Sequence, residues 1–211
     1  MSIARDGWPY IVTLVLLGLL VALRWPWPGL ALVALGLFTA FFFRDPERRV
    51  PEGEGLVVSP ADGKVVQVVA APEGNPVGAG AIQVSIFLSV FDVHINRAPV
   101  AGRITDVAYH KGDFLPAFDH KASLSNEQNC VTIDGGKSRV AFKQIAGLIA
   151  RRIVFRKRVG DSVARGERVG LIKFGSRVDL FLPRDTALRV AVGERVSGGV
   201  TVIGELPARA R

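Results

Sequence analysis

The sequence predicts a mainly β fold of the α+β class, in which an antiparallel β-sandwich or barrel-like domain follows an N-terminal hydrophobic helical hairpin. Two uncharged apolar runs within the first 43 residues predict the hairpin. From Val50 onward, short β-branched runs alternate with Gly and Pro turns, a pattern typical of antiparallel strands. A length of 211 residues suffices for one or two domains. We expect a hairpin over residues 1–43 and a β-rich domain over residues 44–211.

The hairpin is predicted from residues 10–23 and 30–43, two runs of 14 residues each. Helices of this length would measure about 21 Å, which is short of the roughly 30 Å hydrocarbon core of a bilayer. A hairpin that enters the membrane and returns therefore fits better than two full spans. The Arg-Trp-Pro-Trp-Pro-Gly segment at 24–29 should turn the chain. All three tryptophans lie in this part of the protein and suit the headgroup level of a membrane.

A cleaved signal peptide and a buried hairpin in a soluble core are the competing interpretations of these runs. The only charges before the first run are Arg5 and Asp6, and no A-x-A site follows it, which argues against a signal peptide. Arg44, Arg48 and Arg49 follow the second run. By the positive-inside rule, they place the downstream domain on the cytoplasmic face of the cell membrane.

Ten strands are expected in the β-rich domain, separated by turns that contain Gly paired with Asp, Glu or Gly. The expected strands are residues 55–59, 63–70, 82–88, 102–109, 130–134, 139–145, 151–156, 168–173, 178–182 and 188–192. Two exceptions, residues 90–95 and 115–124, are expected to be helical.

The net charge of +8 is concentrated after residue 150, where 14 basic side chains accompany 6 acidic ones. Such an excess favours an anionic partner, and nucleic acid, phospholipid headgroups and acidic substrates all qualify. Every tryptophan and both tyrosines lie before residue 151, so a base-stacking platform for nucleic acid is not expected there.

Metal ligands are scarce in the sequence. The single cysteine, Cys130, excludes an intramolecular disulfide and a Cys-rich zinc site. His110 and His120 have no partner at metal-binding spacing. We therefore expect no metal.

Three segments carry residues suited to nucleophilic catalysis. Asp62 lies in an Asp-Gly turn, His94 interrupts an apolar stretch, and Ser176 follows Gly175 between two apolar runs. With Asp62 to orient it, His94 could deprotonate Ser176, which could then attack an external acyl group or the unhindered Gly175 carbonyl. The second path would cut the chain by β-elimination and leave a pyruvoyl group. No G-x-S-x-G elbow surrounds Ser176, which disfavours an α/β-hydrolase.

Five blocks, in order between about residues 41 and 183, resemble the phosphatidylserine decarboxylase family, particularly its short form. The blocks are FFFRDPER at 41–48, VVSPADGKV at 57–65, FDVHINRAPVAG at 91–102, QIAGLIARRI at 144–153 and GLIKFGSRVD at 170–179. Larger members of the family have Leu-Gly-Ser-Thr where this chain has Phe-Gly-Ser-Arg, as short members do.

The resemblance implies a proenzyme that cuts itself between Gly175 and Ser176 into a β subunit, residues 1–175, and an α subunit, residues 176–211. Ser176 would become a pyruvoyl group whose ketone forms a Schiff base with the amine of phosphatidylserine and accepts electrons as CO₂ leaves. The product would be phosphatidylethanolamine, and no metal or diffusible cofactor is implied. Asp62 and His94 match the family's acidic and histidine positions, which assigns both to self-processing and His94 also to decarboxylation.

The resemblance also bears on partners. Arg97 stands where larger members place a second histidine, so we expect it to bind the substrate phosphate or carboxylate. Phosphatidylserine and membrane lipids are the expected partners, nucleic acid is not, and a homo-oligomer is left open.

Two further interpretations remain. Residues 159–170 and 59–66 resemble the strand-turn repeat of lipoyl and biotinyl carriers, which would make the chain a membrane-anchored adaptor without enzymatic activity. A carrier lysine usually lies between methionines, however, and the only methionine is Met1. The other interpretation is a pyruvoyl decarboxylase for a soluble amino acid.

Overall fold

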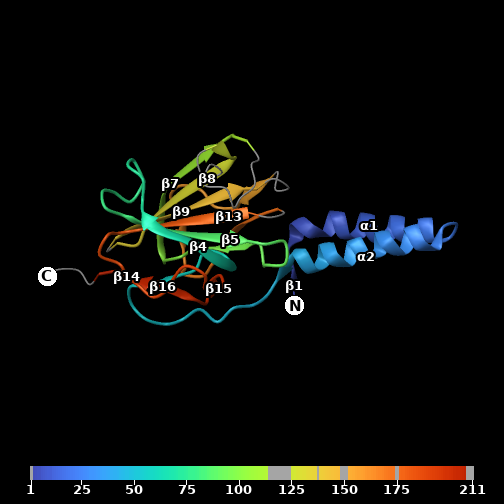
Figure 1. The fold of residues 1–211 in the computed structure, drawn as a ribbon, viewed down its shortest axis with the longest axis horizontal. Coiled ribbons are helices and arrows are strands. Elements are labelled where there is room, and N and C mark those ends of the chain that lie inside the picture. Colours follow the sequence, from blue (N-terminus) through green and yellow to red (C-terminus); the bar gives the residue numbers. More distant parts are fainter. Residues whose placement is uncertain (1, 114–124, 137, 148–151, 174–175, 208–211) are drawn as a thin grey trace. The chain divides into compact units, whose positions relative to one another are not determined.

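The structure, a computed structural model, describes residues 2–113, 125–136, 138–147, 152–173 and 176–207. The chain forms two compact units, Met1–Glu47 and Arg48–Arg211. The predicted fold class is confirmed, because a curled antiparallel sheet forms the second unit and a pair of apolar helices forms the first (Figure 1).

The first unit is a pair of antiparallel helices, α1 (Trp8–Ala22) and α2 (Pro26–Phe42), which lie side by side (Figure 1). Glycine allows their close approach, because a Cβ at Gly29 would lie only 2.5 Å from the Cβ of Ala22. The strands β1 (Ser2–Ile3) and β2 (Arg44–Asp45) pair antiparallel and join the two ends of this unit. A short 3₁₀ helix, η1 (Arg5–Gly7), leads from β1 into α1.

The continuous helical segment Arg5–Ala22 has 18 residues and is long and apolar enough to cross a membrane by length and composition. The large apolar side chains of Leu20, Leu23 and Trp27 are exposed in this unit. The predicted turn over residues 24–29 is too long, because α2 already begins at Pro26. Proline fits the first turn of a helix, where the missing N–H would have had no partner.

The second unit is built on an eight-stranded antiparallel sheet in the order β11-β7-β8-β9-β13-β5-β4-β15. The strand bounds are β4 (Gly63–Ala70), β5 (Ile82–Leu88), β7 (Gly102–His110), β8 (Gln128–Asp134), β9 (Arg139–Ala146), β11 (Ser162–Val163), β13 (Ser176–Leu182) and β15 (Arg195–Val196). Strand β13 therefore lies inside the sheet, with β9 on one side and β5 on the other (Figure 1).

Two three-stranded sheets complete this unit. One has the order β10 (Ile153–Phe155), β12 (Arg168–Ile172), β6 (Ile95–Arg97), and the other β14 (Ala187–Leu188), β16 (Val202–Glu205), β3 (Leu56–Val58). The first packs on the core face of β9, where the rings of Phe142 and Phe155 are 6.4 Å apart. The buried layer is aliphatic and includes Val84, Ile86, Val131, Ile133, Val140, Val178 and Leu180.

Nine of the ten expected strands coincide with strands of the structure. The expected strand at 188–192 is wrong, since β14 ends at Leu188. The expected helix at 90–95 is also wrong, because both the backbone N–H and the hydroxyl of Ser89 donate to the Asp92 carboxylate and close a turn, after which β6 begins at Ile95. The expected helix at 115–124 lies outside the described residues.

Candidate active site

Ser176 is the first residue of β13, where it pairs with Leu88 of β5 and Ala146 of β9. Its side chain is fully buried. Ser176, Val178 and Leu180 share one face of the strand, and because Val178 and Leu180 belong to the aliphatic core, Ser176 also lies on the core face. Its Oγ has no hydrogen-bond partner within the described part of the chain. A buried polar group without a partner costs about 1–3 kcal/mol, so its presence asks for an explanation other than stability. Gly175, the other half of the expected cleavage site, lies outside the described residues.

His94 is buried and directly precedes β6. Its carbonyl oxygen accepts a hydrogen bond from the N–H of Ile172 at 3.3 Å, which extends the β6–β12 pairing by one residue. Ile172, whose N–H bonds to His94, is the last residue of β12, and Ser176 follows it only four residues later in the sequence. The histidine and the serine therefore lie near the same end of the fold.

The imidazole of His94 is oriented by a backbone group. Its Nδ1 lies 3.0 Å from the carbonyl oxygen of Asp92, which can only accept a hydrogen bond. Nδ1 therefore carries the hydrogen, and Nε2 of the neutral ring is the basic nitrogen.

Asp62 lies in the turn that precedes β4, and both of its carboxylate oxygens have partners. Oδ2 accepts from Nη2 of Arg48 and Oδ1 accepts from the N–H of Gly198, each at 2.7 Å. Burial raises the pKa of Asp62 above its ordinary value, because it outweighs the lowering effects of the Gly198 N–H and Arg48, and the charge of Asp92 raises the pKa further. The structure thus bonds Asp62 to Arg48 and Gly198 rather than to His94.

Asp92 is the residue that connects these groups. Its carboxylate accepts from the N–H and the hydroxyl of Ser89, at 2.9 and 2.7 Å, and pairs with Arg195. Its carbonyl holds His94, and its charge acts on Asp62. Sequence reasoning missed this role, although Asp92 stands only two residues before His94.

Arg97 is buried on β6 and contacts two loops. Its Nη1 donates to the carbonyl oxygen of Gly166 at 2.9 Å. Gly199 has a φ of +75°, and a Cβ there would lie 2.7 Å from Cδ of Arg97. This position holds the two loops together, while the expected binding of a substrate anion by Arg97 stays a prediction.

Three buried amide side chains form a second polar group that sequence reasoning missed. Nδ2 of Asn129 donates to Oε1 of Gln144 at 3.0 Å, and Nε2 of Gln144 donates to Oδ1 of Asn96 at 2.8 Å. Gln144 lies two residues from Ala146, the partner of Ser176, so these amides occupy the same face of the sheet as the serine.

The basic excess of residues 151–211 is partly used inside the fold. Arg165 donates to the carbonyl oxygens of Pro51, Gly53 and Leu56. Arg177 pairs with Asp179, and Lys157 pairs with Glu167 at 2.5 Å. The charge available to an external anion is therefore smaller than the sequence suggests.

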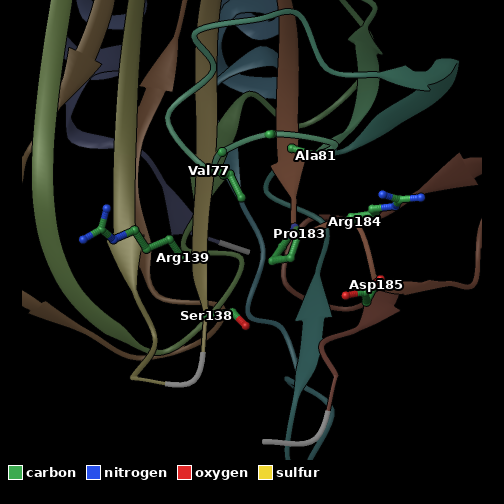
Figure 2. Close-up of a pocket in the computed structure, with 9 residues that line it drawn as sticks. Val77, Ala81, Ser138, Arg139, Pro183, Arg184 and Asp185 are labelled. Atoms are coloured by element: carbon green, nitrogen blue, oxygen red, sulfur yellow. The ribbon is translucent and has the colours of Figure 1, made fainter. Parts of the chain in front are cut away.

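Other candidate sites are weaker. A hollow of about 430 Å³ lies at the opposite end of β13, lined by Pro183 and Arg184 after the strand and by Arg139 (Figure 2). The two guanidinium groups point away from each other, so they do not form a converging anion site (Figure 2). In the described ranges, no three His, Cys, Asp or Glu side chains gather as metal ligands would.

Comparison with known proteins identifies close relatives. The family model for phosphatidylserine decarboxylase matches residues 35–204. A phosphatidylserine decarboxylase proenzyme of Symbiobacterium thermophilum is 52% identical over 208 residues, which cover 97% of this chain and 96% of the relative. Proenzymes of the same name from Solibacter usitatus and Geobacter sulfurreducens are 51% and 47% identical, over 96% and 97% of both chains.

Proposed function

The chain belongs to the phosphatidylserine decarboxylase family, and from this premise we propose that it converts phosphatidylserine to phosphatidylethanolamine and CO₂ with a pyruvoyl group made from its own Ser176. The observation that carries the proposal is the Oγ of Ser176, which is fully buried and lacks a partner among the described residues. Most buried hydroxyl groups in folded proteins have a hydrogen-bond partner, so a buried serine hydroxyl without one supports a chemical role.

Self-cleavage begins with His94 as the base. Since the Asp92 carbonyl fixes the hydrogen on Nδ1, Nε2 takes the proton of the Ser176 hydroxyl. Oγ attacks the carbonyl carbon of Gly175, the peptide bond breaks as its nitrogen gains a proton, and an ester joins the two residues.

Elimination then completes the cut. Loss of the Cα proton of residue 176 breaks its Cβ–Oγ bond and releases the Gly175 carboxylate. The remaining dehydroalanine takes up one water and loses one ammonia to give the pyruvoyl group. The two fragments therefore weigh together about 1 Da more than the uncut chain, since water and ammonia have nearly equal masses.

The surroundings of residue 176 fit the pyruvoyl group. Leu88 and Ala146 flank it with apolar side chains, and pairing on both sides holds its backbone in the sheet. When present, the group supplies a carbonyl that condenses with an amine and withdraws electrons as CO₂ leaves. Burial keeps water away from that carbonyl, which favours the amine of the substrate over hydration.

Asp62 acts on this centre through Asp92 rather than by contact with His94. Two carboxylates in mutual repulsion, each with its own arginine, set the field around the Asp92 carbonyl that orients the imidazole. We assign Asp62 a positioning role in self-processing, and His94 the role of base.

The helical hairpin carries the enzyme to its lipid substrate. The exposed apolar side chains of α1 and α2 and the arginines that follow α2 support an attachment to the cytoplasmic face of the cell membrane. The interpretation as a carrier loses its basis, because it does not account for a buried reactive serine.

The test is the intact mass of the purified protein beside a Ser176→Ala variant, with Ser162→Ala on the exposed part of β11 as the control. We expect two fragments split after Gly175, with the 36-residue fragment lighter than its sequence by one ammonia, in the wild type and the control only. Phosphatidylserine in detergent micelles should lose CO₂, whereas free serine should not. A single uncut chain from an active preparation would overturn the proposal.

A further inference from the structure

Asn96 is a fully buried amide on β6 whose Nδ2 has no hydrogen-bond partner in the described ranges. We infer that this Nδ2 binds the carboxylate of the serine headgroup, which makes Asn96 a specificity-determining residue. The inference rests on the proposed function and adds a residue that recognises the carboxylate that is lost as CO₂.

The orientation of the Asn96 amide is set by its neighbours. Oε1 of Gln144 already accepts from Nδ2 of Asn129, so Gln144 can only turn its Nε2 toward Asn96. That donor requires the oxygen of Asn96, at 2.8 Å, and leaves Nδ2 as the open end of the relay. A buried donor held in this way, without a partner, is suited to an acceptor that arrives later.

The open donor lies in the layer that holds Ser176. Asn96 reaches from β6 to Gln144 on β9, whose side chain shares the core face of the sheet with Ser176. His94 lies two residues before Asn96 in the extended β6–β12 pairing, so the two side chains leave the chain on the same side. The base and the open donor therefore face the same buried layer as the serine.

The chemistry of the headgroup selects the carboxylate as the ligand. A donor cannot bind the ammonium group, which leaves the carboxylate and the phosphate as acceptors. The phosphate is bonded to the glycerol of the lipid, whereas the serine is the leading end that reaches the buried layer. The deepest donor should therefore meet the carboxylate.

A neutral amide also suits a carboxylate that must leave as CO₂. A fully charged partner would stabilise the ground state more than the transition state, because negative charge leaves the carboxylate as the bond breaks. Arg97, the nearest buried cation in the sequence, already donates to the Gly166 carbonyl. An uncharged donor orients the carboxylate with less resistance to its departure.

The experiment measures binding of two soluble headgroups to the uncut Ser176→Ala protein by calorimetry. Glycerophosphoserine carries the carboxylate and glycerophosphoethanolamine lacks it. The Asn96→Asp change keeps an oxygen for Gln144, replaces the donor with a second oxygen and adds a negative charge that repels a carboxylate. We expect it to weaken binding of glycerophosphoserine by about tenfold or more, at least the size of one hydrogen bond to a charged group, and not to weaken binding of glycerophosphoethanolamine.

A matched surface variant is the control. Asn75→Asp, in the surface turn between β4 and β5, should change neither affinity. Equal weakening of both ligands by Asn96→Asp, or no weakening of either, would overturn the role of Asn96. Both of those results leave the proposed function standing, since decarboxylation of phosphatidylserine by the wild type tests it separately.

Discussion

Ser176 and Arg177 are neighbours at the start of β13, and their side chains leave the strand on opposite faces of the sheet. Both are buried polar residues. The guanidinium of Arg177 bonds Asp179 at 2.6 Å, Ser85 at 2.7 Å and Gln67 at 3.1 Å, whereas the hydroxyl of Ser176 has no partner in the part of the chain described. Folding explains the first arrangement by itself. The second gains nothing from folding, which is consistent with the chemical role proposed for Ser176.

The face that carries Arg177 is polar beyond this one residue. Nζ of Lys143 lies 5.7 Å from the centre of the Phe181 ring. Burial raises the pKa of the Cys130 thiol on β8 to about 11, the charge of Lys143 acts to lower it, and the charges of Asp106 and Asp179 act to raise it. This thiol is therefore protonated and unreactive at neutral pH.

The largest expected effect concerns Arg177, the residue of the two whose side chain has hydrogen-bond partners. Arg177→Ala removes one partner of a buried ion pair and leaves the Asp179 carboxylate without its guanidinium, so we expect a loss of about 3–5 kcal/mol in the free energy of unfolding. Denaturant unfolding of the uncut Ser176→Ala protein, with and without the change, measures it. The double change Arg177→Met and Asp179→Leu should recover the stability of the parent or exceed it. If the single change costs under about 1 kcal/mol, the two faces do not differ as described.

Replacing Ser176, whose hydroxyl has no partner, should change the free energy of unfolding in the opposite direction. In an uncut His94→Gln background, Ser176→Ala removes a buried hydroxyl without a partner, and we expect the free energy of unfolding to rise by up to about 1–3 kcal/mol. The same denaturant titration checks this expectation. A fall in stability would mean that the hydroxyl is satisfied in solution, and the contrast with Arg177 would disappear.

The smallest expected effect concerns Asp62, which is partnered like Arg177 and yet held at a raised pKa by burial. A carboxyl with a raised pKa contributes stability below its ordinary value of 3.8 and loses that contribution as the pH rises through the folded-state pKa. Relative to the parent, Asp62→Asn should therefore gain stability as the pH rises from about 4 through the folded-state pKa of Asp62, and no further gain should follow above that pKa.

Glu167 is the control of opposite sign for this titration. Although burial acts to raise its pKa, the hydrogen bonds from Lys157 and the Ala164 N–H lower it below the ordinary value of 4.5. Glu167→Gln should therefore cost stability above pH 4.5, and the cost should vanish as the pH falls through the folded-state pKa. Thermal unfolding in detergent across this range measures both variants, and parallel pH profiles would contradict the assignment of Asp62.

Much of the fold could be predicted because its longer strands carry a local signal. The bounds expected for residues 63–70 and 82–88 are those of β4 and β5, where β-branched residues run between clear turns. The short strands β6 and β15, of three and two residues, carry too few side chains to show a period. The prediction of a helix at 90–95 was wrong because hydrogen bonds from Ser89 to Asp92 fix a turn there. Such bonds cannot be read from the periodicity of apolar residues.

The site was predictable as far as its motifs reach. Asp62, His94 and Ser176 were singled out from turn chemistry and from a family resemblance, whereas Asn96 and Gln144 were not. Their importance comes from a contact across 48 residues of sequence, and it is visible only when the open Nδ2 of Asn96 is seen at the end of the relay. Long-range hydrogen bonds leave no trace in local spacing.

The strand pairing of the last 36 residues has a consequence for the life of the molecule after cleavage. Strand β13 pairs with β5 and β9, β15 with β4, and β16 with β3, so every one of these ladders joins the two products. A protein cut after Gly175 would keep its shape and yet become a dimer of unequal chains. Unfolding would let the short chain diffuse away, and refolding would turn bimolecular and slow with dilution, with an added cost in translational entropy. Unfolding of the uncut chain would thus be reversible, whereas unfolding of the mature protein in dilute solution would be irreversible.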